Sequence, residues 1–392
     1  MSRARIRVLQ VVGSLAAGGI ETWLTHVHRH VDRTRFHIDY LVHISLRSHY
    51  TDVVTALGAT IYHCPSPRNP LRYVPSLIVT LKRHGPFDVV HSHVQHFSGV
   101  VLLAARAARV PVRVAHCHAA GLPDDSYPSL PRHLYTSLAG RWIRRYATHK
   151  LSASHASASA LFGSDPAPDG SYQVLYNGID LEPFRGPDDR ASVRAEWGIS
   201  ATALVAGHVG SFIPVKNHEL LLRSFARLKK QVPDAWLLLV GDGPLCRSIH
   251  ALARALECDQ QIVFTGVRHD VPRLMRAMDV FLFPSFSEGL GLVALEAQAA
   301  GLPVIASEGV PREVSVIPEL MTWVPAATPD AWVAAILNTL SRPQPVTPQE
   351  AHALMEASQF NIARSVRGLE DIYSSGYAAA QPSPRTDAVA AR

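Results

Sequence analysis

Cysteine is scarce in this sequence and follows no recognisable pattern. The 392 residues contain four cysteines, and no two of them form a Cys-x-x-Cys pair or a zinc-type spacing. Disulfide scaffolds need several paired cysteines and an oxidising compartment. The scarcity therefore excludes a disulfide-stapled secreted module, and it predicts free thiols and a cytoplasmic location.

Long apolar runs are also missing. No uncharged apolar stretch reaches the roughly 18 residues that a membrane-spanning helix requires. The basic start at residues 1–7 leads directly into a short strand-like segment instead of a signal-peptide core. These absences predict a chain without a secretory leader or a membrane span, so any membrane contact has to be peripheral.

Extreme charge is the third absence. The 38 Lys and Arg residues exceed the 32 Asp and Glu residues by a formal charge of +6. This diffuse balance suits phosphate-bearing ligands or an anionic membrane surface, but it does not indicate nucleic acid as a partner. Apolar residues are plentiful instead, at 47% of the chain. Since single cores stop growing at about 250 to 300 residues, the length predicts two domains.

Short β-prone runs alternate with helical patterns along most of the chain, which is typical of βαβ units around a parallel sheet. The predicted strands are 6–13, 37–42, 60–63, 88–93, 112–118, 150–154 and 173–176 in the first half, and 204–209, 236–240, 262–265, 280–283 and 304–307 in the second. The pattern predicts the α/β class with two Rossmann-like, doubly wound domains.

The domain limits follow from the same pattern. We expect a first domain over residues 1–185 and a second over 190–345. A helix at about 360–376 has no strand after it, so we expect it to pack back on the first domain. The tail 378–392 is rich in Ala, Pro, Ser and Arg without apolar periodicity, and it is predicted to be disordered.

The strongest chemical signal lies at residues 283–296, where a predicted strand gives way to a glycine-containing turn and then to a helix. Backbone N–H groups at such a helix start attract phosphate. Glu288 in the turn and Glu296 in the helix can accept hydrogen bonds from sugar and ribose hydroxyls. An unpaired Glu296 inside an apolar run would be costly to bury, which favours a functional role over a solvated surface pair. The neighbours expected to approach a nucleotide sugar are Gly289, Leu290, Gly291 and Leu292.

Three further turns after predicted strands carry candidate groups, namely Gly18 with Gly19, Gly210 and Ser211 with Lys216, and Val267 with Arg268. Lys216 can place a compact positive charge on a leaving diphosphate. The Gly18 turn lets the backbone contact phosphate or acceptor, although it lacks strict GxGxxG spacing. Main-chain groups near Val267 could read the edge of a base.

Histidines gather at the ends of two predicted first-domain strands, at His91, His93, His116 and His118. Ligands collect at the carboxyl ends of strands in open α/β sheets. Strand alternation places His116 and His118 on the same side, so either could contact a sugar, and we prefer His118 because it is nearer the strand end. No third cluster of ligands stands out for zinc, so we predict no metal site.

Together these segments resemble the retaining GT-B glycosyltransferases of family 4, also called group 1, and the resemblance covers nearly the whole chain. Its most specific element is an E-x7-E motif, matched by Glu288 and Glu296. The resemblance implies two domains facing a cleft, with Glu288 on the donor sugar, Glu296 on the ribose and Lys216 on the leaving diphosphate. It also implies a nucleotide-diphosphate sugar as donor substrate, retention of configuration, and no metal or other cofactor.

Within that family the Gly18-Gly19 and His116-Cys117-His118 segments look most like exopolysaccharide-assembly members. The resemblance implies a UDP-sugar rather than a GDP-sugar donor, and a glycan or lipid-linked acceptor in bacterial surface polysaccharide synthesis. The basic and aromatic stretch 131–150 could rest on the inner face of the cytoplasmic membrane, or it could be an ordinary solvated helix flank.

One position departs from the family pattern. The family commonly has an arginine where this chain has Ser211, so one clamp on the diphosphate is missing unless Arg268 or Arg312 supplies the charge. The alternative function is therefore a non-catalytic or degenerate sugar-nucleotide-binding subunit. A nicotinamide-dependent oxidoreductase would share the sheets but needs a GxGxxG with an acidic residue about 20 positions on, and that fingerprint is absent.

Overall fold

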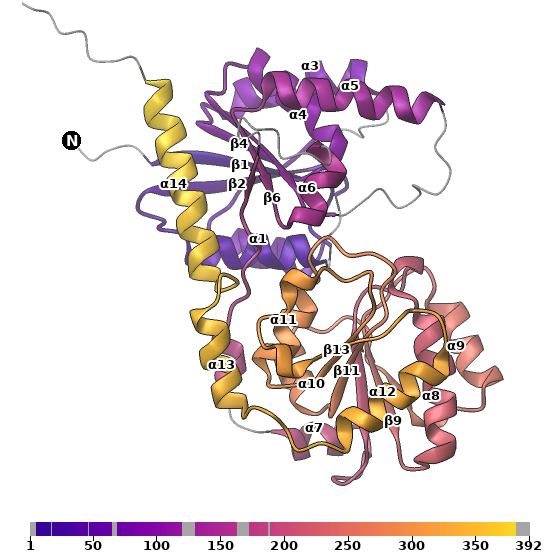
Figure 1. The fold of residues 1–392 in the computed structure, drawn as a ribbon. Helices are drawn as coiled ribbons and strands as arrows, with labels where there is room; N and C mark the ends of the chain where they lie inside the picture. The colour runs from indigo at the N-terminus through magenta and orange to yellow at the C-terminus, as the bar shows by residue number, and fades with distance from the viewer. Residues whose placement is uncertain are drawn as a thin grey trace, which may run out of the picture.

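The computed structural model describes residues 5–16, 18–45, 47–64, 69–119, 130–162, 172–186 and 189–381, and it contains two parallel sheets (Figure 1). The first half comprises β1 (Ile6–Val12), α1 (Gly19–His30), β2 (Phe36–Val42), α2 (His49–Ala56), β3 (Ile61–His63), α3 (Pro70–His84), β4 (Val89–Ser92), α4 (Ser98–Ala107), β5 (Val112–Cys117), α5 (Leu130–Tyr146), β6 (His149–Ser152), α6 (His155–Phe162) and β7 (Gln173–Val174).

The second half comprises α7 (Arg190–Glu196), β8 (Val205–Val209), α8 (His218–Gln231), β9 (Trp236–Val240), α9 (Cys246–Ala255), β10 (Ile262–Phe264), α10 (Val271–Arg276), β11 (Val280–Phe283), α11 (Leu292–Ala299), β12 (Val304–Ala306), β13 (Met321–Trp323), α12 (Pro329–Leu340), α13 (Pro348–Ala357) and α14 (Ile362–Ala380). The predicted α/β class with two Rossmann-like domains is confirmed.

The strand order predicts where ligands bind on each sheet, and we call the carboxyl ends of the strands the functional edge. The first sheet runs β3-β2-β1-β4-β5-β6-β7 and the second β10-β9-β8-β11-β12-β13, with parallel pairing throughout. The order reverses between β1 and β4 in one sheet and between β8 and β11 in the other. Ligands of open α/β sheets bind at the carboxyl ends of the strands beside such reversals. The turns after β1, β8 and β11 are those that carry Gly18, Lys216 and Glu288.

The last helix crosses from the second sheet to the first. α13 lies beside the second domain, and α14 then runs along the first domain next to α1 and β1 (Figure 1). α14 buries residues three or four positions apart, which is the spacing of one helix face. These residues join the core between α1 and the first sheet, and they are Ile362, Val366, Leu369, Ile372 and Tyr373.

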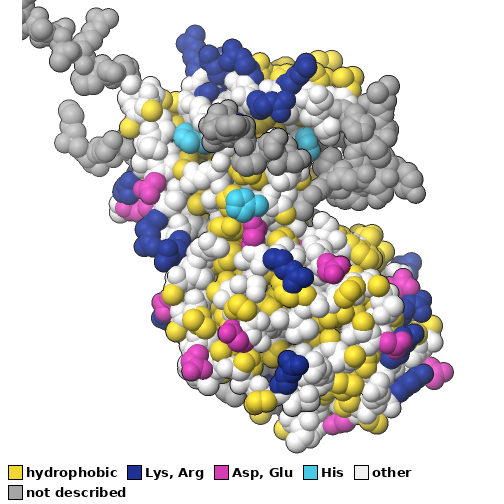
Figure 2. All heavy atoms as spheres, in the orientation of Figure 1, with side chains coloured by type: hydrophobic (Ala, Val, Ile, Leu, Met, Phe, Trp, Pro, Cys, Tyr) yellow, Lys and Arg dark blue, Asp and Glu magenta, His cyan; other side chains and the backbone are white. Residues whose placement is uncertain are grey.

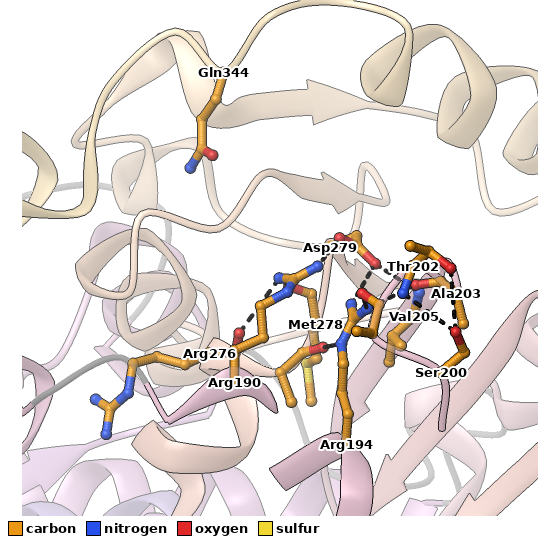
Figure 3. Close-up of polar contacts among 12 residues, drawn as sticks. Arg190, Arg194, Ser200, Thr202, Ala203, Val205, Arg276, Met278, Asp279 and Gln344 are labelled. Carbon is orange, nitrogen blue, oxygen red and sulfur yellow. Dashed lines mark hydrogen bonds and ion pairs between the residues drawn. The ribbon is translucent and has the colours of Figure 1, made fainter. Parts of the chain in front are cut away.

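An arginine pair ties α7 to the second sheet on the side away from the functional edge. Arg190 and Arg194 converge on Asp279, which precedes β11 (Figure 3). Arg194 is 1% exposed, and its guanidinium donates to Asp279 at 2.8 Å and to the carbonyl oxygens of Ala277 at 3.0 Å and Ala203 at 2.8 Å. The buried guanidinium of Arg194 therefore has both a carboxylate counterion and backbone acceptors.

The structure differs from the sequence-based expectations in several elements. β13 was not predicted, because its one β-branched residue is Thr322, whereas the equally short β10 and β12 each contain two adjacent apolar β-branched residues. The tail predicted to be disordered from residue 378 is helical to Ala380, since alanine favours continuation of α14. Residues 382–392 lie outside the described part of the chain. Among the described residues, no helix combines the length and apolarity needed to cross a bilayer.

Candidate active site

A cavity of about 600 Å³ lies between the two sheets, at the carboxyl ends of their strands. Of the residues singled out in the sequence, those that line it are Gly18, Gly19, His118, Gly210, Ser211, Lys216, Val267, Arg268, Glu288, Gly289, Leu290, Gly291, Leu292 and Glu296. His116 does not line it. The folded chain thus brings together turns from both domains around one cleft.

Lys216 and Glu288 face each other across two neighbouring turns of the second domain. Lys216 ends a 3-10 turn after β8, and its Nζ lies 2.6 Å from Glu288 Oε1 and 5.4 Å from the ring centroid of Phe283. The two turns are also joined by the Phe286 N–H, which donates to the Val215 carbonyl at 2.8 Å. Both charged side chains are mostly buried, so the pair is held firmly at the wall of the cleft.

The turn before α11 requires glycine. Gly291 has φ of 94°, a left-handed conformation, and a Cβ there would lie 2.9 Å from the Phe283 ring. This turn exposes the start of α11 to the cleft, where Leu292 and Val293 line the cavity. The free N–H groups of a helix start and the helix dipole favour a phosphate at this point.

Glu296 projects from α11 into the cleft. Loss of hydration raises the pKa of its carboxyl to about 7. Across the cleft, Tyr50 of the first domain is close enough that the Glu296 charge helps to raise the pKa of its phenol, after burial, which is the larger cause. Tyr50 hydrogen-bonds the Thr22 hydroxyl at 2.6 Å. The Glu296 carboxyl can accept hydrogen bonds from the hydroxyl groups of a ligand.

The structure separates the two candidate histidines. Both are on the same side of β5, as alternation predicted, with ring centroids 4.0 Å apart. His118 lines the cavity, whereas His116 is fully buried behind it and packs edge-on against Trp23. His118 is not free to bond, because Asn177 Nδ2 lies 3.0 Å from its Nδ1 and His93 Nδ1 lies 2.8 Å from its Nε2.

The two arginines considered as replacements for the missing diphosphate clamp, Arg268 and Arg312, are placed differently from each other. Arg268 lines the cleft, but it forms a bidentate ion pair with Asp270 at 2.8 Å for both bonds. Arg312 does not line the cavity, and its guanidinium lies 3.8 Å above the ring of Trp323. Arg268 therefore lies on the same cleft as Ser211, where it shares its charge with Asp270, and Arg312 lies away from the cleft lining.

The cleft is closed by direct contacts between the domains. A Cβ on Gly289 would lie 1.8 Å from the His118 carbonyl oxygen, and the Gly289 carbonyl accepts a hydrogen bond from Ser154. His49 of the first domain also stacks on His269 of the second, with ring centroids 3.7 Å apart. The turn that carries Glu288 therefore packs against the first domain.

Sequence reasoning missed several lining residues. Tyr50 and His49 belong to α2, which has no motif, and they reach the cavity only because the two domains meet there. Asn177 also lines the cavity and contacts His118, and its position directly after the predicted strand 173–176 could have suggested it.

Comparison with known proteins agrees with this architecture. The family model described as glycosyl transferases group 1 matches residues 189–359, and the model described as Glycosyltransferase Family 4 matches residues 17–183. A putative glycosyltransferase, EpsF, from Bacillus subtilis strain 168 is 34% identical over 88% of this chain and 90% of its own length. A D-inositol 3-phosphate glycosyltransferase from Saccharomonospora viridis is 30% identical over 95% of this chain and 92% of its own length.

Solved structures share the fold. HepE from Anabaena in complex with UDP-glucose superposes with a TM-score of 0.78 at 22% identity, over 94% of this chain and 99% of that one. WaaG, a glycosyltransferase involved in lipopolysaccharide biosynthesis, superposes with a TM-score of 0.67 at 20% identity, over 95% and 98% of the two chains. With both domain models matched and a relative above 30% identity along most of its length, this chain belongs to the group 1, family 4 glycosyltransferases of the GT-B fold.

Proposed function

We propose that this chain is a retaining glycosyltransferase that moves a hexose from a UDP-sugar to a glycan or lipid-linked acceptor without a metal ion. The observation that carries the proposal is the convergence of Lys216, Glu288 and Glu296 around the start of α11 in one interdomain cleft. The UDP-glucose bound by HepE supports a uridine nucleotide, and the relation to WaaG supports a role in surface polysaccharide.

The geometry suggests a division of labour for donor binding. The diphosphate would lie at the N–H groups that begin α11, with the Lys216 ammonium stabilising the charge that develops as it leaves. The ribose hydroxyls would donate to Glu296, and the donor sugar would meet Glu288. Main-chain groups near Val267 would contact the base.

The transfer step itself would take place on the side of the first domain. The acceptor hydroxyl would attack the anomeric carbon on the face from which the diphosphate departs, and the leaving phosphate would take up its proton. Contacts such as that between Gly289 and His118 would exclude water from the donor, which limits wasteful hydrolysis.

A lipid-linked acceptor would place the first domain at a membrane. Lys and Arg side chains gather with hydrophobic ones at the upper end of the molecule, over the first domain (Figure 2). The large apolar side chains exposed on α3 and α5 are Leu71, Val79, Leu134, Tyr135 and Leu138, and basic side chains in the last turns of these helices are Lys82, Arg83, Arg144 and Arg145. We propose that this face rests on the anionic inner surface of the cytoplasmic membrane. The side chain of Arg132, at the start of the basic stretch, lies outside the described part of α5.

Transfer from UDP-sugars in the presence of EDTA tests the proposed function. Mass spectrometry of products formed on a bacterial lipid extract should show a hexose addition by the wild type, at a rate that Lys216→Ala lowers about a hundredfold or more. Lys230→Ala, a change to an exposed lysine on α8, serves as the matched control.

Ser211 gives the alternative a specific basis. Binding of a UDP-sugar with neither transfer nor hydrolysis, over a wide set of acceptors and with metal added, would refute the enzymatic proposal. It would favour a sugar-nucleotide-binding subunit of a glycosyltransferase complex.

A further inference from the structure

A chain of buried hydrogen bonds leads from the cleft to the C-terminal helix. His118 Nε2 lies 2.8 Å from His93 Nδ1, and His93 Nε2 lies 2.8 Å from Gln10 Oε1. The side-chain nitrogen of Gln10 then donates to the hydroxyl of Tyr373, on α14, at 3.2 Å. At the cleft end, Asn177 Nδ2 lies 3.0 Å from His118 Nδ1. Five side chains from five separate parts of the chain are thus linked in series.

The bonds in this series all run in one direction. Burial lowers the pKa of His93 well below its usual value and that of His118 to about 3, so both rings are neutral and each has one N–H and one accepting nitrogen. Gln10 Oε1 can only accept, so His93 Nε2 carries the proton and His93 Nδ1 accepts. His118 Nε2 must then donate, which leaves His118 Nδ1 as an acceptor. The amide nitrogen of Asn177, which can only donate, matches this arrangement.

Tyr373 sets that direction from the far end. Its hydroxyl is buried, accepts from Gln10 and lies 2.6 Å from His91 Nδ1, which can accept the hydroxyl proton. His91 Nε2 continues the series to His116 Nδ1 at 3.2 Å. Without the Tyr373 hydroxyl, the Gln10 amide nitrogen loses its acceptor. The amide group can then rotate so that its oxygen and nitrogen exchange places. A turned amide would present N–H to His93, and the tautomers of both His93 and His118 would reverse.

We propose that Tyr373 is a positioning residue for the cleft. Acting through Gln10 and His93, Tyr373 holds His118 Nδ1 as a hydrogen-bond acceptor for a sugar hydroxyl. The Asn177 amide would be the group that this hydroxyl displaces. Asn177 lines the cavity, and its side-chain oxygen is buried with no hydrogen-bond partner among the described residues, so the amide has little to hold it in place. The inference rests on the proposed function, because the hydroxyl belongs to a bound donor or acceptor.

A metal ion is the competing explanation of the same cluster. Among the described residues, one nitrogen from each of His91, His93 and His116 lies within 4.8 Å of the others, close enough to share an ion. Both ring nitrogens of His91 and His93 are already used in the hydrogen bonds above. Three neutral imidazoles would also leave a divalent charge uncompensated in a fully buried place. The hydrogen-bonded arrangement is therefore favoured.

Histidine-selective ¹⁵N NMR on the intact chain tests the inference. The His118 signals, assigned by their loss in His118→Gln, should show a protonated Nε2 and an unprotonated Nδ1 in the wild type. Tyr373→Phe should give the reversed or a mixed tautomer. It should also lower kcat for transfer about tenfold while KM for the donor stays within about threefold. Tyr377→Phe is the matched control, since Tyr377 lies one turn along on α14 and its hydroxyl bonds no described residue.

Several results would overturn the inference. One is a protonated Nδ1 on His118 of the wild type, and another is an unchanged tautomer in Tyr373→Phe with only a lower melting temperature. Histidine signals that shift when EDTA is added would show that a metal holds the cluster instead. If Tyr373→Phe does not fold, Gln10→Met breaks the same series and must produce the same tautomer change. The NMR result is independent of turnover, so a wild type that shows the expected tautomer but no transfer refutes the proposed function alone.

Discussion

At the residue scale, the Lys216 ammonium that faces the expected diphosphate is already paired with a carboxylate. Lys216 is held by Glu288 at 2.6 Å, so part of its field is neutralised before it acts on a phosphate. Ser211 lines the same cleft two residues after Val209 ends β8, and it contributes no charge. The balance of charge in the cleft should therefore respond to a substitution at this single position.

Ser211→Arg should strengthen nucleotide binding. A guanidinium at this position can form charge-assisted hydrogen bonds to a diphosphate, so we expect Kd for UDP, measured by calorimetry, to fall about tenfold. Ser211→Met adds similar bulk without charge and should not tighten binding. An arginine variant that binds UDP no better than wild type would show that the diphosphate does not approach this turn.

Glu296 should make stability depend on pH. Its carboxyl has a pKa of about 7 in the folded chain and near 4.5 when unfolded, so the folded state holds the extra proton between these values. The stability that the Glu296 carboxyl contributes therefore falls as pH rises from about 4.5 to 7. Melting temperatures of Glu296→Gln should exceed those of wild type at pH 8 by more than at pH 4.5. Glu308→Gln, at an exposed carboxyl, is the control, and a pH-independent difference for Glu296→Gln would contradict the account.

At the scale of elements, the join between α7 and the second sheet depends on Asp279. Removing its carboxylate in Asp279→Ala leaves the buried Arg194 guanidinium without a counterion, which should lower the free energy of unfolding by about 3 to 5 kcal/mol. Asp330→Ala removes an exposed partner of Arg227 and should cost no more than about 1 kcal/mol. Urea titrations of the intact chain compare the two, and equal losses would show that Arg194 is not held by this pair.

The turn between β11 and α11 controls how closely the domains approach. Gly289→Ala puts a Cβ against the His118 carbonyl, a backbone atom that cannot rotate away, so the cleft should fail to close. Because misplacement by about 1 Å can cost about a hundredfold in rate, we expect kcat to fall by that order. Gly13→Ala, where a Cβ meets nothing within 4 Å, is the matched control. Small-angle scattering of the nucleotide-bound proteins should show a more open Gly289→Ala, and a compact, active variant would contradict the prediction.

At the scale of the whole molecule, the fold class was predictable because it depends on a local alternation that is repeated in both halves. The turns at Gly18, Lys216 and Glu288 were also predictable, since each directly follows a recognisable strand. Contacts across the cleft were not. Strand alternation placed His116 and His118 on one face but could not give their depth, and Tyr50 reaches the site only through the meeting of the domains.

The central claim is that a nucleotide sugar binds in this interdomain cleft against Glu296. It is tested most directly by a thermal-shift series with UDP-, GDP- and ADP-sugars in EDTA, repeated on Glu296→Ala. We predict that a UDP-sugar raises the melting temperature of the wild type and that Glu296→Ala loses most of this shift. No shift with any donor, or an equal shift in the variant, would contradict the assignment of the cleft as the donor site.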